Sequence, residues 1–169
     1  IAGQLLSVVI VHFGLGYQLP LGACLVLIAA SVAINTGLLI RFGPGHRPNS
    51  LLAFYQLAFD CLQLGGLLYL TGGLGNPFAL LLLAPVSVSA STLPSRETLL
   101  LVGLVALIAS ILALFHLPMP WDPAAPFSPP PLYLLGVWTA ILCGVAFIAG
   151  YINKVAHEAR QLADALTVT

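Results

Sequence analysis

The stretch LYLLGVWTAILCGVAFIAGYIN, residues 132–153, contains no charged side chain. A helix needs about 20 mostly apolar residues to cross the hydrocarbon core of a bilayer, and this stretch is long enough. The rest of the chain has the same character, because 60% of its 169 residues are hydrophobic, only 6% are charged, and the mean hydropathy is +1.07. A water-soluble domain of this size could not bury so much apolar surface. We therefore expect an all-α, polytopic membrane protein.

Five further apolar runs precede this stretch, and short connections rich in glycine and proline separate them. The six predicted spans cover residues 1–13, 20–40, 51–70, 78–93, 98–117 and 132–153. Residue 1 already lies inside an apolar run, so we expect the sequence to belong to a longer protein. Pro85 lies inside the fourth span and predicts a bend there. Residues 1–153 are thus predicted to form one transmembrane domain of six helices.

The five Lys and Arg residues give the predicted orientation. Arg41 and Arg47 lie in the second connection, Arg96 lies in the fourth, and Lys154 and Arg160 follow the last span. The first, third and fifth connections contain none. Positive residues concentrate on the cytoplasmic side of membrane proteins. With an even number of spans, both termini are predicted to be cytoplasmic.

Composition also argues against two other classes of site. The formal net charge is zero, whereas a nucleic-acid-binding protein would need a basic patch. Cys24, Cys61 and Cys143 all lie in apolar runs, and their spacing fits neither a metal site nor a disulfide framework. We interpret them as small apolar residues in helix packing and expect no metal.

Asp60 is the one acidic residue deep inside a predicted span. A carboxyl group in hydrocarbon is costly, so such a residue is by default a functional candidate. Gln56 and Gln63 lie four residues before and three residues after it, on the same helix face. This polar stripe predicts either a proton or ligand contact or a set of interhelical hydrogen bonds, and the sequence favours neither.

The segment after the last predicted span, residues 154–169, mixes charged and apolar residues. Val155, Ala159, Leu162 and Leu166 recur at steps of four, three and four, which places them on one helical stripe. The stripe predicts a helix that leaves the membrane and starts a dimeric coiled coil. The alternative is a single amphipathic helix on the membrane surface.

The third connection reads TGGLGNPF, residues 71–78. Gly72 and Gly73 permit backbone conformations closed to other residues and let a ligand approach the main chain. Asn76 supplies a hydrogen-bond donor and an acceptor, Pro77 suits the start of a helix, and Phe78 offers a flat apolar face. An amphipathic ring with carbonyl oxygens and an isoprenoid tail would suit this surface. A tight turn between two helices would also account for most of these residue types.

The pattern Gly72-Gly73-x-x-Asn76-Pro77-Phe78 resembles the GGxxNPF heptapeptide of the RegB/PrrB/ActS group of redox-sensing histidine kinases. Three further segments are similar to the same family, namely residues 11–16, 79–86 and 158–166. The last of them resembles the helix that leads toward the phosphoacceptor region of these kinases. The resemblance covers nearly the whole chain.

The resemblance implies a six-span sensor domain in the bacterial inner membrane that responds to the redox state of the ubiquinone pool. Gly72, Gly73, Asn76, Pro77 and Phe78 would bind ubiquinone or ubiquinol as a ligand rather than a catalytic cofactor, with Gln56, Asp60 and Gln63 as polar support. The family kinase is a homodimer that autophosphorylates a histidine and passes the phosphoryl group to a response regulator.

Nothing near His157 resembles a phosphorylation motif, and no nucleotide-binding sequence follows it. We therefore expect residues 154–169 to begin a cytoplasmic signalling helix, with the dimerisation and phosphoacceptor region beyond residue 169. The chain itself would be catalytically inert, and no catalytic residue is predicted in it.

Two other functions remain open from the residues themselves. His12 and His116 are predicted near the same membrane face, where two facing rings would be needed to ligate a haem. Asp60 with its two glutamines could instead serve as the coupling site of a small transporter. A visible absorption spectrum would identify the first, and vesicle uptake the second.

Overall fold

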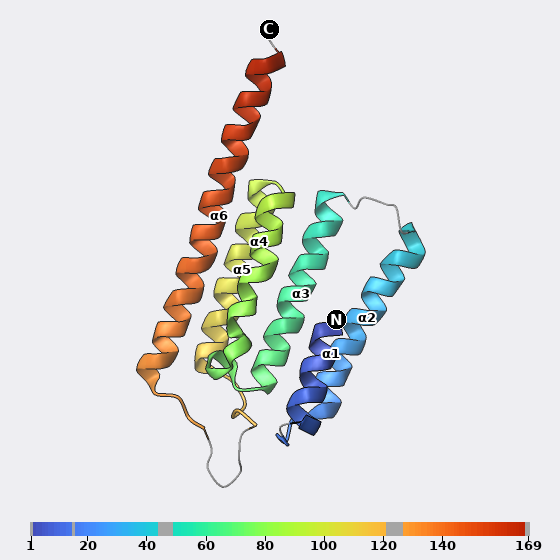
Figure 1. The fold of residues 1–169 in the computed structure, drawn as a ribbon, viewed down its shortest axis with the longest axis vertical. Helices are drawn as coiled ribbons and strands as arrows, with labels where there is room; N and C mark the ends of the chain where they lie inside the picture. Colours follow the sequence, from blue (N-terminus) through green and yellow to red (C-terminus); the bar gives the residue numbers. More distant parts are fainter. Residues whose placement is uncertain (1, 15, 44–48, 121–126, 168–169) are drawn as a thin grey trace.

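The computed structural model describes residues 2–14, 16–43, 49–120 and 127–167, and these form a helical bundle with no β-strand among them (Figure 1). The elements are α1 (Ala2–Val9), η1 (Ile10–Gly14), α2 (Leu21–Phe42), α3 (Ser50–Leu70), η2 (Gly73–Gly75), η3 (Pro77–Leu82), α4 (Leu83–Thr92), α5 (Ser95–Leu114) and α6 (Pro131–Thr167). Here η1 is a π-helix, and η2 and η3 are 3₁₀ helices. The predicted all-α fold is confirmed.

The apolar helical segments match the predicted spans. Within the described residues, α2, α3, α5 and the part of α6 from Pro131 to Ala159 are long and apolar enough to cross a membrane. Two shorter apolar segments, Gln4–Gly14 and Pro77–Thr92, lie where the first and fourth spans are predicted. Apart from the C-terminal end of α6, the observed and predicted boundaries agree to within three residues.

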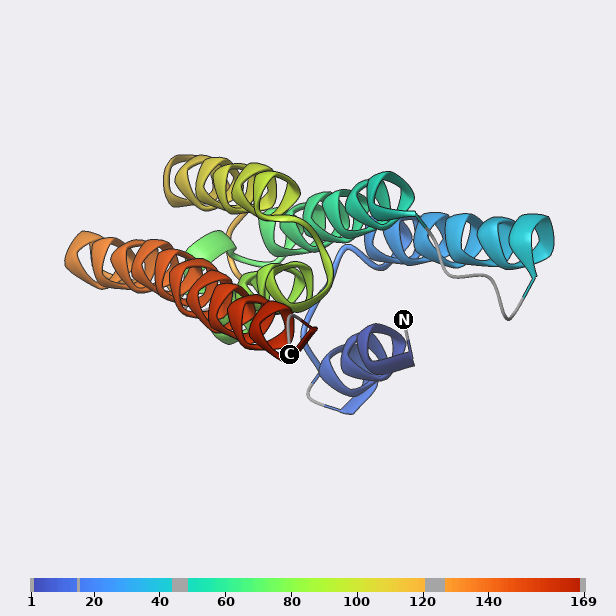
Figure 2. The same cartoon turned by 90° about the horizontal axis from the view of Figure 1, so that it is seen from above.

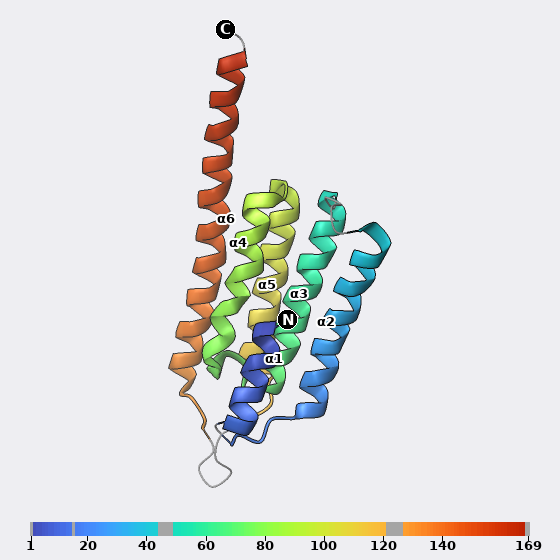
Figure 3. The ribbon, with the colours of Figure 1, turned by 45° about the vertical axis from the view of Figure 1, so that its right-hand side comes forward.

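The last helix, α6, continues well past the predicted end of its span at residue 153. It runs without interruption from Pro131 to Thr167 and projects beyond the other helices at the C-terminal end (Figures 1 and 3). Arg41 lies in the last turn of α2 and Arg96 in the first turn of α5, both at the end of the bundle from which α6 projects. Arg47 and the side chain of Arg160 lie outside the part of the chain that is described. That this end is cytoplasmic stays a prediction.

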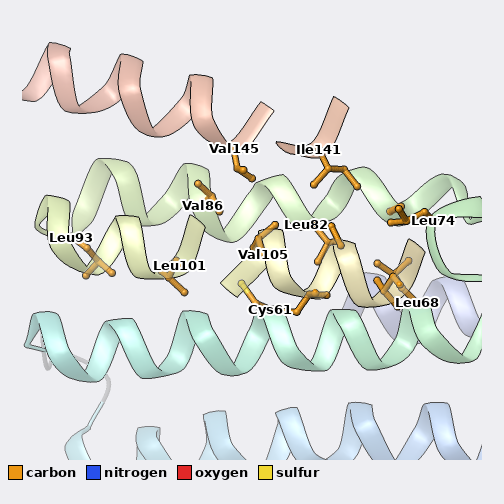
Figure 4. Packing of buried hydrophobic residues seen from close by; sticks show 14 residues of the cluster. Cys61, Leu68, Leu74, Leu82, Val86, Leu93, Leu101, Val105, Ile141 and Val145 are labelled. Carbon is orange, nitrogen blue, oxygen red and sulfur yellow. The ribbon is translucent and has the colours of Figure 1, made fainter. Parts of the chain in front are cut away.

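The core lies between α3, α4, α5 and α6. Leu68 of α3, Leu82 of η3, Val105 of α5 and Ile141 of α6 meet there and are at most 2% exposed (Figure 4). Helices α1 and α2 lie to one side of this group, and α2 is packed against α3 (Figure 2). In a bilayer the exposed apolar side chains of the outer helix faces contact lipid, which is as apolar as they are.

Two adjacent glycines of α3 allow its neighbours to approach closely. A Cβ on Gly65 would lie 2.8 Å from Cγ2 of Ile108 in α5. A Cβ on Gly66 would lie 3.1 Å from Cδ1 of Leu27 in α2. Because helix association in lipid depends on close packing, these small residues help hold α5 and α2 on two sides of α3.

Polar side chains add hydrogen bonds between helices at both ends of the core. Trp138 of α6 donates its ring N–H to Ser110 Oγ of α5 at 3.1 Å. Near the opposite end, Ser95 Oγ at the start of α5 donates to Asn153 Oδ1 of α6 at 3.0 Å. Polar groups at membrane depth need such internal partners because the lipid offers none.

The fourth span changes helix type along its length. It begins as the 3₁₀ helix η3 and becomes α-helical at Leu83, whose N–H bonds to the carbonyls of Leu80 and Leu81. Pro85, the third residue of α4, has no N–H to donate to the carbonyl of Leu81 four residues earlier, and that carbonyl instead accepts from the N–H of Leu83. The proline thus marks the change of helix type inside this span.

Replacing Gly65 by alanine should destabilise the bundle. The added Cβ would force Ile108 away from α3, and overpacking of this kind costs about 1–3 kcal/mol. We expect a lower unfolding temperature for purified Gly65→Ala in detergent. Gly103→Ala is the matched control, because a Cβ at Gly103 meets no atom within 4 Å. Equal unfolding temperatures for the two variants would contradict the packing described here.

Candidate functional site

The heptapeptide forms a compact corner between α3 and the fourth span, which we call the GGxxNPF corner (residues 71–78). Gly72 and Gly73 adopt φ values of +106° and +57°, a region that side-chain-bearing residues rarely occupy. The chain then makes the single turn η2 and enters η3 at Pro77. Leu74 at the centre of the turn is fully buried in the core and anchors the corner there (Figure 4).

Asn76 holds the two sides of this corner together. Its Nδ2 donates to the carbonyl oxygen of Thr71 at 3.0 Å and to Thr71 Oγ1 at 2.8 Å. Its Oδ1 accepts from the backbone N–H of Phe78 at 2.9 Å and so caps η3. The Asn76 amide therefore has a structural role, with both of its N–H hydrogens and its oxygen engaged inside the corner.

The connection between α5 and α6 lies across the corner. We call its described residues, 115–120 and 127–130, the strap. The backbone N–H of Leu117 donates to the carbonyl oxygen of Tyr69 near the end of α3 at 2.9 Å. This hydrogen bond fixes the start of the strap on the last turn of α3. Figures 1 and 3 show the corner and the strap at the same end of the bundle.

The glycines of the corner make room for the strap. A Cβ on Gly72 would lie 2.9 Å from Cβ of Met119, and one on Gly73 would lie 2.6 Å from Cγ of the His116 ring. A Cβ on Gly75 would lie 3.0 Å from Cγ of Pro129. All three glycines are buried. The strap of the same chain, rather than a ligand, thus makes the close approach that these glycines permit.

The side of the corner away from the strap is exposed. Pro77 is exposed and Phe78 is 46% exposed, and Leu80 and Leu81 beside them on η3 are about half exposed. The five predicted site residues therefore present two surfaces. The glycines contact the strap, and Pro77 and Phe78 offer an apolar surface at the edge of the bundle. Asn76 is half-buried between these two surfaces.

The predicted polar support lies elsewhere on α3. Gln63 donates to the carbonyl oxygen of Leu27 at 3.2 Å and to Oε1 of Gln4 at 3.3 Å. Gln56 donates to Oδ1 of Asn35 in α2 at 2.8 Å. These bonds tie α3 to α2 and α1, as the hydrogen-bonding alternative predicts. The half-buried Asp60 shares this face, and even Gln63 is about 12 Å from Thr71 along the helix.

The two candidate haem ligands each bond to a carbonyl of their own connection. His12 Nδ1 lies 2.9 Å from the carbonyl oxygen of Tyr17, and His116 Nδ1 lies 3.0 Å from that of Leu117. Among the described residues there is no group of three or more His, Cys, Asp or Glu side chains that could hold a metal ion.

Sequence reasoning did not anticipate the strap. It considered His116 only as a haem ligand and did not single out Leu117, Met119 or Pro129. One signal was present, because the third and fifth connections have to emerge on the same side of the membrane. Which residues of the two connections touch depends on the tertiary fold.

The fold and the corner define the class of protein, a multi-pass helical domain whose last helix continues out of the bundle. The chain belongs to the PilS-like transmembrane domain family, whose six-span model matches residues 5–163. All 169 residues align at 40% identity with the sensor histidine kinase RegB of Cereibacter sphaeroides, and equally with RegB of its strain ATCC 17023. The chain spans 37% of the length of these relatives. No solved structure matches it.

These similarities confirm three predictions. The chain has the fold of a RegB-type transmembrane sensor domain, it is a six-span all-α protein, and it belongs in the bacterial inner membrane as a multi-pass protein.

Asn76→Ala should loosen the corner, because it removes three hydrogen bonds and leaves the Phe78 N–H and the Thr71 carbonyl without these partners. We expect the variant to lose about 1–3 kcal/mol of stability, seen as a lower unfolding temperature. Thr71→Val is the graded comparison, since it removes only the bonds of the Thr71 hydroxyl and leaves the Asn76 bonds to both backbone groups. An Asn76→Ala protein as stable as Thr71→Val would contradict the bracing role of Asn76.

Proposed function

We propose that this chain is the membrane input domain of a two-component sensor histidine kinase and that it senses the redox state of the ubiquinone pool. The 40% identity to the sensor histidine kinase RegB supports the first part. The observation that supports quinone sensing is the GGxxNPF corner, where Phe78 is exposed at the edge of the bundle beside a glycine turn that the hydrogen bonds of Asn76 hold together.

The exposed surface of the corner suits a quinone. The ring of Phe78 offers a flat face on which a second ring can stack. Leu80 and Leu81 follow it along η3 and are about half exposed, so an isoprenoid tail would pass beside them into lipid. Ubiquinone acts here as a ligand whose redox form is read, rather than as a catalytic cofactor.

Two redox forms can give two signals only if they bind two arrangements of the domain with different affinities. The oxidised ring has carbonyl oxygens that only accept hydrogen bonds, whereas the hydroxyl groups of ubiquinol also donate.

The corner and the adjoining fourth span contact α6, or the residues just before it, at two places. Gly75 touches Pro129, two residues before α6 begins, and Leu83 at the start of α4 packs against Gly144, where a Cβ would lie 2.9 Å from Leu83 Cδ2.

The projecting part of α6, from residue 154 onward, is the proposed signalling helix. Val155 and Leu162 of the apolar stripe are 44% and 68% exposed, so these two side chains can pair with a second copy of the chain. Both termini of the membrane domain would be cytoplasmic. In the complete kinase the paired helices of the homodimer would continue into a region that autophosphorylates and transfers the phosphoryl group to a response regulator.

Phe78→Ala should weaken ubiquinone binding by about tenfold or more, because it removes the stacking surface of the proposed site. The measurement is a titration of the purified chain in lipid nanodiscs with a short-chain ubiquinone, followed by the quenching of tryptophan fluorescence.

Phe147→Ala is the matched control, since Phe147 is an exposed aromatic residue of α6 about 24 Å along that helix from its start near the corner. Its affinity for ubiquinone should equal that of the wild type. The proposal fails if Phe78→Ala and Phe147→Ala bind ubiquinone equally well.

A further inference from the structure

A cavity of about 430 Å³ lies where α6 leaves the other helices, at the end of the bundle opposite the GGxxNPF corner (Figure 1). Residues 90–95, which form the end of α4 and the turn into α5, make one wall of this cavity. Asn153 and His157 of α6 make the other wall. Quinone sensing at the corner makes no use of these residues.

The hydroxyl groups of the cavity already donate their hydrogens within the protein. Those of Ser91 and Thr92 donate to the carbonyl oxygen of Val88 at 2.9 Å and 2.7 Å. That of Ser95 donates to Oδ1 of Asn153 at 3.0 Å and so joins the two walls. Side-chain N–H donors for a ligand therefore have to come from the wall that α6 forms.

Asn153 and His157 each keep an N–H hydrogen for a ligand. Among the described residues, Asn153 is engaged only through Oδ1, so the hydrogens on its Nδ2 remain. The amide nitrogen of Gln161 lies 3.0 Å from Nε2 of His157, and because an amide nitrogen only donates, Nε2 is the acceptor. In the neutral ring Nδ1 then carries the hydrogen. Two donors one helical turn apart thus suit a ligand that has several acceptor oxygens.

Positive side chains flank the cavity on both walls. Arg96 lies in the first turn of α5 and Lys154 follows the apolar span of α6, and both are exposed. Lys154 also forms an ion pair with Glu158 at 3.9 Å, but both side chains of this pair are mostly exposed and the pair contributes little. Of the acidic side chains nearest in sequence, neither Glu97 nor Glu158 lines the cavity. The charges around the cavity therefore favour an anion.

The same face of α6 has room for a hydrocarbon chain on the membrane side of the cavity. Ala146, Gly150, Asn153 and His157 follow one another at steps of four, three and four, so they share one helix face. Ala146 and Gly150 are small and exposed, and a Cβ on Gly150 would meet no atom within 4 Å. A ligand whose polar head lies in the cavity thus has space for an apolar tail along α6.

We propose that this cavity binds the phosphate group of an anionic membrane lipid whose acyl chain lies along α6. The N–H groups of Asn153 and His157 donate to the phosphate oxygens, and the two flanking cations balance the negative charge. The lipid joins the α4–α5 turn to α6 and adds to the Ser95–Asn153 hydrogen bond at the point where the signalling helix leaves the bundle. The site is independent of ubiquinone binding at the corner.

A titration followed by NMR locates the ligand and measures its affinity. The purified ¹⁵N-labelled chain in an uncharged detergent is titrated with a short-chain phosphatidylglycerol, and the resonances of the Asn153 amide and the His157 ring are followed. We expect both resonances to move and to saturate. The diacylglycerol with the same acyl chains lacks the phosphate and should move neither. Inorganic phosphate lacks the chains and should need a concentration at least about tenfold higher.

Asn153→Asp tests the donor role, because Oδ1 can still accept from Ser95 while an oxygen replaces the donating Nδ2. We expect the affinity for phosphatidylglycerol, followed at His157, to fall about tenfold or more. Asn49→Asp is the matched control, since it adds the same charge just before α3 at the same end of the bundle and outside the cavity. Its Oδ1 can still accept from the N–H of Leu52, as that of Asn49 does at 2.8 Å, and the affinity should be unchanged.

Three results would overturn the lipid site, namely no movement of either resonance with phosphatidylglycerol, equal movement with the diacylglycerol, or equal weakening by the two aspartate variants. Equal affinity for inorganic phosphate would identify a soluble anion as the ligand and would also overturn it.

Discussion

Hydrocarbon offers a protein no hydrogen-bond partners, and the way this chain meets that constraint decides the structure of its corner. Within each span the helix satisfies the backbone. Where α3 ends, the chain must turn at the membrane edge, and Asn76 uses all of its amide hydrogens and its oxygen to bridge Thr71 and Phe78. The glycines keep the turn small enough for the strap to lie on it.

The sequence was sufficient to predict the spans, because a run of about twenty apolar residues without charge is long enough to cross a bilayer and too apolar to face water. It also located the corner, since the glycine, asparagine and proline signals are local. It could not say that Met119 and His116 fill the space beside Gly72 and Gly73, because these contacts join segments about 45 residues apart. The same holds for Gln56 and Gln63. Their common face was evident, but their partners Asn35 and Leu27 are set by how α2 packs on α3.

The corner and α6 are connected in a way that suits a sensor. Gly75 contacts Pro129 just before α6 begins, and Gly144 of α6 receives Leu83 at the start of α4. A ligand that repositions the strap or η3 therefore acts on the helix that leaves the bundle. Packed helices tend to shift between discrete arrangements rather than deform continuously, so a small change at the corner suffices. Farther along, the Ser95–Asn153 hydrogen bond holds α6 near the point where it leaves the other helices.

The most direct test of the central claim is to map the covalent adducts of a photoreactive ubiquinone analogue on the purified chain in nanodiscs. The account predicts labelled peptides from the GGxxNPF corner and from η3, residues 77–82, with labelling suppressed by excess unmodified ubiquinone. Competable labelling confined to the α2–α3 face around Asp60, with none at the corner, would contradict it.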